Sequence, residues 1–123
     1  TGHGIGSFLS VHEGPQRISK KSIFPGVELL PGMIISNEPG FYKEGEYGIR
    51  IENIIIVQEI NGGLLNFENI SWAPIDRDLI ETDILNENEL KWINEYHKSV
   101  FKKISHLLTP EEKLWLQKVT MPL

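Results

Sequence analysis

The most strand-like stretch of this chain is residues 49–57, Ile49-Arg50-Ile51-Glu52-Asn53-Ile54-Ile55-Ile56-Val57. β-Branched residues dominate it, and its first part alternates between apolar and polar side chains, which is typical of a β-strand. The apolar run at its end predicts burial on both faces. A glutamate inside such a strand needs a cation, because an unpaired buried carboxylate is strongly destabilising. Arg50, on the same face as Glu52, or a metal ion could supply that charge.

The glycines and tryptophans divide the chain into two parts around this strand. All 11 glycines lie between Gly2 and Gly63, and all three tryptophans lie in the second half. Residues 1–62 therefore read as a β-rich first part, with a short apolar stretch at 7–11 and a strand at 33–36 after a Pro-Gly turn. Residues 63–123 read as a strand near 64–67 followed by two helices. We predict an α+β fold.

Both helices have start signals in the sequence. Asn86 with Glu89 is a capping pair for a helix over about 87–107, where apolar residues recur at helical spacing. Thr109-Pro110-Glu111-Glu112 offers a capping threonine, a proline in the first turn and a glutamate at the third position. The last helix should carry Leu114, Trp115 and Val119. His97 and His106 fall on the helical pattern, and we interpret them as packing or surface residues.

Composition narrows the classes of function. The chain has 123 residues, 40% of them hydrophobic and 24% charged, with a formal net charge of −5 and no cysteine. The lack of cysteine excludes a disulfide scaffold, a zinc ribbon and a thiol nucleophile, and it fits a reducing compartment. The acidic balance argues against nucleic acid, and no run reaches the roughly 18 apolar residues of a membrane span. No basic, then apolar, then small-residue pattern opens the given sequence. Because it opens inside a dense motif, we expect residues to precede Thr1.

Three polar features stand out from an ordinary α+β domain. They are the motif Gly2-His3-Gly4-Ile5-Gly6 with His12 after it, Glu38 before a Pro-Gly break, and Glu52 in the apolar strand. Each alone has an ordinary interpretation, as a loop histidine, a solvated turn residue and an exposed ion pair with Arg50. Together, an imidazole nitrogen and two carboxylates suit a divalent ion such as Mn(II), Zn(II) or Co(II).

Five motifs in order carry a family resemblance: Gly2-His3-Gly4-Ile5-Gly6, Val11-His12-Glu13-Gly14-Pro15, Pro31-Gly32-Met33, Asn37-Glu38-Pro39-Gly40-Phe41-Tyr42 and Gly48-Ile49-Arg50-Ile51-Glu52-Asn53. They resemble the C-terminal half of the catalytic domain of the aminopeptidase P (Xaa-Pro aminopeptidase) family. That domain has the pita-bread fold, shared with prolidase, methionine aminopeptidase and creatinase. The nine-residue spacing of His3 and His12 is wider than in prolidases and favours the longer, three-domain branch. Residues 63–123 resemble the C-terminal extension of that branch.

The resemblance implies a role for each polar residue. His3 matches a metal ligand, Glu38 a metal ligand that also handles the proton of the attacking water, and Glu52 a carboxylate that bridges two metal ions. His12 matches a histidine that contacts the substrate and stabilises the tetrahedral intermediate. Arg50 matches an arginine that supports the carboxylates from behind.

The family pattern also has two aspartate ligands and a further histidine, all upstream of the His3 motif. Asp76, Asp78 and Asp83 follow the last catalytic motif, so their order does not let them replace those ligands. The chain thus carries three of five expected metal ligands, and we expect it to be inactive alone.

The implied function is a metal-dependent aminopeptidase that removes the first residue from peptides with proline in second position. The implied cofactor is a pair of divalent ions, Mn(II) first, with Zn(II) or Co(II) possible. The implied setting is cytoplasmic, with a homodimer for the full-length protein and no nucleic-acid or membrane partner. Alternatives left open are a prolidase or methionine aminopeptidase of the same fold, a non-catalytic binding module, and a structural domain whose helical tail forms a dimer contact.

Overall fold

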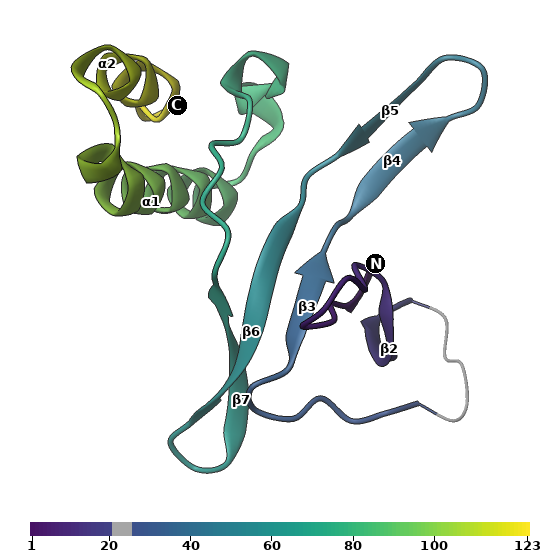
Figure 1. Ribbon diagram of the computed structural model, residues 1–123. Coiled ribbons are helices and arrows are strands. Elements are labelled where there is room, and N and C mark those ends of the chain that lie inside the picture. Colours follow the sequence, from purple (N-terminus) through teal and green to yellow (C-terminus); the bar gives the residue numbers. More distant parts are fainter. Residues whose placement is uncertain (21–25) are drawn as a thin grey trace. The chain divides into compact units, whose positions relative to one another are not determined.

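The computed structural model describes residues 1–20 and 26–123. The chain forms two compact units, Thr1–Ser71 and Trp72–Leu123. Among the described residues, the strands lie in the first unit and the two α-helices in the second, so a mixed β and α composition is confirmed (Figure 1). The predicted boundary between residues 62 and 63 falls in the turn between two paired strands of the first unit.

The first unit is built on antiparallel pairing. Its strands are β1 (Gly2–Gly4), β2 (Glu13–Ile18), β3 (Ile34–Asn37), β4 (Gly40–Lys43), β5 (Tyr47–Arg50), β6 (Asn53–Ile60) and β7 (Leu64–Asn69). Five of them form a sheet in the order β2-β1-β3-β6-β7, and β4 and β5 form a separate two-stranded ladder. Figure 1 shows the long strand β6 between β3 and β7.

The core of the first unit lies on one face of β3 and β6. Ile35 pairs directly with Ile55, and both are buried together with Val57. Ile18, Leu29 and Met33 pack against them. The alternate residues Ile54 and Ile56 are only partly buried, so the predicted burial on both faces is complete on one face and partial on the other.

The predicted single strand over 49–57 is interrupted at Ile51 and Glu52. The cause lies on the facing segment of the same chain, between β3 and β4. There Pro39 has no backbone N–H and cannot donate a hydrogen bond to the neighbouring strand. Pairing therefore stops at Asn37 with Asn53 and resumes at Gly40 with Arg50. The N–H of Ile51 donates to the carbonyl of Pro39 across the gap, at 3.2 Å. The two breaks face each other, and each contains a glutamate.

Strands β1 and β2 were not predicted, and the apolar stretch 7–11 is a loop between them rather than a strand. Gly2–Gly4 has little intrinsic strand preference because two of its three residues are glycines. Its strand form comes from its neighbours, since it pairs with β2 on one side and with β3 on the other.

In the second unit, the predicted caps are present. Helix α1 spans Glu87–Ile104 and continues as a 3₁₀ turn, Ser105–Leu107, while α2 spans Pro110–Val119. Asn86 and Glu89 form a capping box at the start of α1, and Thr109 and Glu112 form one at the start of α2. Two further 3₁₀ turns, Arg77–Leu79 and Thr82–Ile84, precede α1. None of the helices in the described part of the chain is both long and apolar enough to cross a membrane.

The core of the second unit joins the two α-helices. Tyr96 and Val100 of α1 are buried with Leu116 of α2, while the predicted apolar residues Leu114 and Trp115 are largely exposed. His97 is fully buried and accepts a hydrogen bond from the N–H of Ile75 through Nε2, at 3.1 Å. The interpretation of His97 as a packing residue is confirmed, and His106 lies on the surface.

Candidate functional site

Glu38 lies at the centre of the residues that the sequence singled out. It follows β3, in the gap opposite Glu52, and its Oε1 lies 3.1 Å from Nε2 of His3. The hydroxyl of Ser36, two residues earlier on the same strand face, donates to that Oε1 at 2.9 Å. The Glu38 and His3 side chains are 19% and 25% exposed, so the pair is largely shielded from water.

His3 is oriented by the backbone on both sides. Its own N–H donates to the Ser36 hydroxyl oxygen at 2.9 Å, which fixes β1 against β3. Its Nδ1 lies 2.8 Å from the carbonyl oxygen of Gly4. A carbonyl only accepts hydrogen bonds, so Nδ1 is the donor to Gly4, and Nε2 is the ring nitrogen that faces Glu38.

This geometry requires a positive charge between two acceptors. When the only ring proton of His3 is on Nδ1, both Nε2 and the carboxylate oxygen of Glu38 carry lone pairs at a separation of 3.1 Å. Either a second proton on the ring or a metal ion bound to both atoms can satisfy them. A histidine whose other nitrogen donates to a backbone carbonyl is the usual arrangement of a metal-bound imidazole. The pair therefore fits a divalent cation.

His12 lies beside this pair although nine positions separate it from His3. The two imidazole ring centroids are 4.3 Å apart, with a tilt of 48° between the planes. His12 comes directly before β2, which pairs with β1, so the β1–β2 pairing brings the two histidines together. His12 is exposed, so its ring remains accessible to a ligand at this edge.

Arg50 links the two glutamates of the facing strand breaks. Its Nε lies 3.5 Å from Oε2 of Glu52 and 3.9 Å from Oε2 of Glu38. Its Nη1 donates to the hydroxyl of Tyr42 across the β4–β5 ladder, at 3.2 Å. That hydrogen bond, with the nearby tyrosine and carboxylates, raises the pKa of Arg50, so the guanidinium stays charged. Glu52 is 40% exposed and is not a buried carboxylate.

The structure thus gathers part of the predicted ligand set. Residues 1–20 and 26–123 contain no cluster of three or more His, Asp or Glu side chains arranged around a metal position. His3 and Glu38 meet directly, and Glu52 is connected to them through Arg50. Sequence reasoning missed Ser36 and Tyr42, although the alternation of the strand 33–36 places Ser36 on the same face as Glu38.

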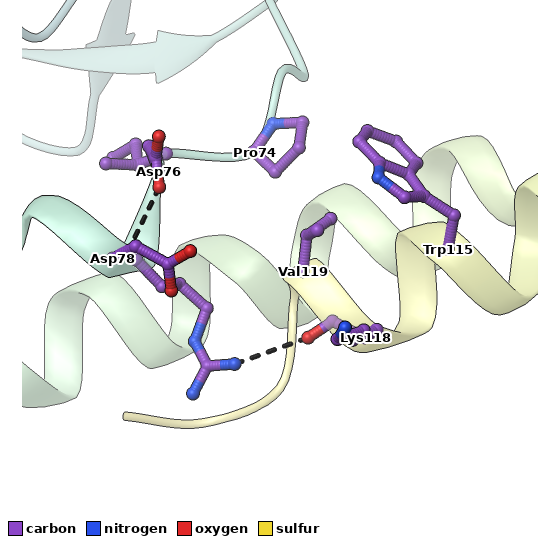
Figure 2. A pocket seen from close by; sticks show the side chains of 8 residues that line it. Pro74, Asp76, Asp78, Trp115, Lys118 and Val119 are labelled. Atoms are coloured by element: carbon purple, nitrogen blue, oxygen red, sulfur yellow. Dashed lines mark hydrogen bonds between the residues drawn. The ribbon is translucent and has the colours of Figure 1, made fainter.

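A separate cavity of about 500 Å³ lies within the second unit (Figure 2). Pro74, Trp115 and Val119 provide apolar walls, and Asp76, Asp78 and Lys118 provide charges. The guanidinium of Arg77 donates from Nη1 to the carbonyl of Lys118 at the end of α2 and from Nη2 to that of Pro122. Asp76 accepts from the N–H of Asp78 and so caps a 3₁₀ turn. The side chains of Asp76 and Arg77 are therefore engaged in hydrogen bonds to the backbone that hold this part of the chain together.

Known proteins resemble the whole chain. A probable Xaa-Pro aminopeptidase P of Coprinopsis cinerea is 46% identical over all of this chain and 21% of its own length. One of Aspergillus flavus is 44% identical, over 20% of its length. The solved X-prolyl aminopeptidase of Caenorhabditis elegans, described as a cytosolic enzyme with a di-nuclear active site, is 32% identical and superposes with a TM-score of 0.84 over 21% of its chain. The chain spans about a fifth of the length of these relatives.

Family models match nearly every residue. The model of metallopeptidase family M24 matches residues 1–59, and the model of the C-terminal region of peptidase M24 matches residues 63–123. The similarity to the solved X-prolyl aminopeptidase confirms the expected pita-bread fold, of which this chain represents one portion. The chain belongs to metallopeptidase family M24, with the catalytic-domain and C-terminal regions adjoining in one sequence.

Proposed function

We propose that this chain is the metal-binding C-terminal portion of a Xaa-Pro aminopeptidase, which removes the first residue from peptides with proline in second position. One observation carries the proposal: Nε2 of His3 and Oε1 of Glu38 are 3.1 Å apart, with the other nitrogen of His3 committed to a backbone carbonyl. The names of the relatives supply the reaction class.

The residues proposed to hold the metal are His3, Glu38 and Glu52. One imidazole and two carboxylates suit a pair of divalent ions, with Mn(II) as the expected metal and Zn(II) or Co(II) as alternatives. When bound, such ions lower the pKa of a water molecule towards neutrality and polarise the substrate carbonyl. Glu52 lies opposite Glu38 in the facing strand break, which supports its proposed role as the second carboxylate ligand.

Each remaining residue has a task that its position supports. Glu38 takes a proton from the attacking water and delivers it to the departing proline nitrogen, while Ser36 holds the carboxylate in orientation through Oε1. The exposed imidazole of His12 donates a hydrogen bond to the developing oxyanion. Arg50, held by Tyr42, keeps both carboxylates aligned without itself reacting.

The partners and setting follow from the same proposal. The substrate is a peptide, and the full-length protein is proposed to be a homodimer. A cytoplasmic location agrees with the cytosolic description of the solved relative. The net charge of −5 argues against a nucleic-acid partner.

The test uses the complete polypeptide that contains this chain, supplied with Mn(II). We expect it to release the first residue from a peptide such as Arg-Pro-Leu and to leave Arg-Ala-Leu intact. Cleavage restricted to the dipeptide Arg-Pro would instead identify a prolidase, and absence of cleavage from all three peptides would contradict the proposal.

A further inference from the structure

The loop between β1 and β2 is closed at its base by a backbone hydrogen bond. The N–H of Gly6 donates to the carbonyl of Ser10 at 2.7 Å, which leaves residues 7–9 as the tip. A Cβ at Gly6 would lie 2.8 Å from that carbonyl oxygen, closer than real Cβ atoms approach one. Glycine is therefore required for this closure, and the loop conformation is specified by the sequence.

The tip presents apolar side chains to solvent at a conformational cost. Phe8 is 81% exposed and Leu9 is 94% exposed. Leu9 also has a φ of +50°, in the left-handed region that disfavours a branched or bulky side chain. Asn or Gly would suit this backbone better, and neither apolar side chain is buried within the chain. Strain of this kind commonly marks a functional position.

The tip lies close to the candidate site. The loop leaves β1 just after His3 and enters β2 just after His12, and the two rings are 4.3 Å apart. Phe8 and Leu9 lie five and six residues after His3 and four and three residues before His12. Each residue spans at most about 3.5 Å. The tip is therefore tethered at the rim of the histidine pair.

We propose that Phe8 and Leu9 bind an apolar side chain of the peptide substrate at the position after proline. This inference rests on the proposed function. An aminopeptidase holds the free amino end of its substrate at the catalytic group, so the part that extends out over the rim is the C-terminal part. Two exposed apolar side chains at that rim offer a contact to the third residue of the peptide, and a dipeptide cannot use it.

The experiment compares variants of the complete polypeptide on three peptides, Arg-Pro-Leu, Arg-Pro-Gly and Arg-Pro-Asp. The variants are Phe8→Ala and Leu9→Asn, the second chosen because asparagine tolerates a positive φ. We expect each to lower kcat/KM for Arg-Pro-Leu about five- to tenfold, through KM and with kcat preserved, while values for the other two change less than twofold. The matched control is Leu64→Asn, an exposed leucine at the start of β7, where it pairs with Ile60 at the end of β6 that is farther from Glu52.

Each result bears on the inference. An unaltered preference for leucine in third position overturns it, as does an equal fall on all three peptides. A drop in melting temperature for Leu9→Asn beyond that of Leu64→Asn shows that other parts of the protein cover the tip, and it also overturns the inference. If the unsubstituted protein cleaves none of the peptides, the proposed function is wrong and this inference falls with it; cleavage without the expected preference removes this inference alone.

Discussion

Ser36 makes two hydrogen bonds that join the two proposed metal ligands. Its oxygen accepts from the backbone N–H of His3, and its hydroxyl donates to Oε1 of Glu38. Ser36 is fully buried, so no water can replace it readily. A residue that orients a ligand in this way controls metal affinity without touching the metal.

Ser36→Ala in the complete protein should therefore weaken Mn(II) binding by about tenfold or more. Loss of a side chain that hydrogen-bonds a metal ligand typically lowers metal affinity by about 10- to 100-fold. Isothermal titration with Mn(II) measures this directly. Ser99→Ala, which removes a hydroxyl that donates to the carbonyl of Glu95 on α1, is the matched control. Equal Mn(II) affinity in the Ser36 variant and the control would contradict the arrangement described for Glu38.

His97 makes the stability of the second unit depend on pH. Burial lowers its pKa, and the positive charge of Arg77 adds to the effect. The N–H of Ile75 also occupies Nε2, the atom that a second proton would take. The unfolded chain binds a proton near pH 6.5 while the folded chain does not, so the free energy of unfolding falls as the pH drops below about 6.5.

Urea unfolding between pH 7.5 and 5 tests this, with tryptophan fluorescence as the probe because all three tryptophans lie in the second unit. His97→Gln keeps an acceptor for Ile75 but cannot titrate, and it should flatten the pH dependence. His106→Gln, at a surface position, should not. The expectation is wrong if the His97 variant loses stability on acidification as steeply as the unsubstituted chain.

At the scale of elements, the helix starts are set by local chemistry. The Thr109 hydroxyl accepts from the N–H of Glu112, and the Glu112 carboxylate accepts from the N–H of Thr109. Thr109→Ala should lower the free energy of unfolding by about 1 kcal/mol, the usual effect of losing such a cap. Urea unfolding measures it, with Thr82→Ala at an exposed position outside both α-helices as control. A change below a few tenths of a kcal/mol would show that α2 does not depend on its cap.

The difference between local and long-range contacts explains which elements could be predicted from the sequence. The caps and the ends of both α-helices depend on residues within four positions of one another, so they could be read directly. The interruption at Ile51 and Glu52 depends instead on Pro39, which lies on the facing segment. β1 depends on two partner strands that are distant in sequence. Register of that kind is not contained in local propensity.

The candidate site divides in the same way. His3, His12, Glu38, Arg50 and Glu52 were singled out by motif, and the structure brings the first three together and links the last two. Ser36 and Tyr42 were missed as contacts, because their hydrogen bonds depend on how β1 meets β3 and on how β4 meets β5. The metal-binding and catalytic roles of the five motif residues stay predictions.

For the whole molecule, the number of negatively charged metal ligands decides whether these 123 residues can bind two metal ions and catalyse the reaction alone. Two carboxylates and one imidazole are offered to two dications, and no larger acidic cluster is present in the described parts of the chain. We expect the isolated chain to bind at most one Mn(II) tightly and to show no appreciable turnover of a Xaa-Pro peptide. A liquid-chromatography assay with Mn(II) checks this; turnover near that of the complete protein would show that the site needs no further ligands.

Glu52 is proposed to bind metal in a Xaa-Pro aminopeptidase of family M24. The most direct measurement is Mn(II) content and cleavage of Arg-Pro-Leu by the complete protein and its Glu52→Gln variant, which keeps the size of the side chain and removes its charge. We predict that the variant loses at least one Mn(II) per chain and at least about 1,000-fold in kcat. Unchanged metal content with near-normal cleavage would contradict the claim.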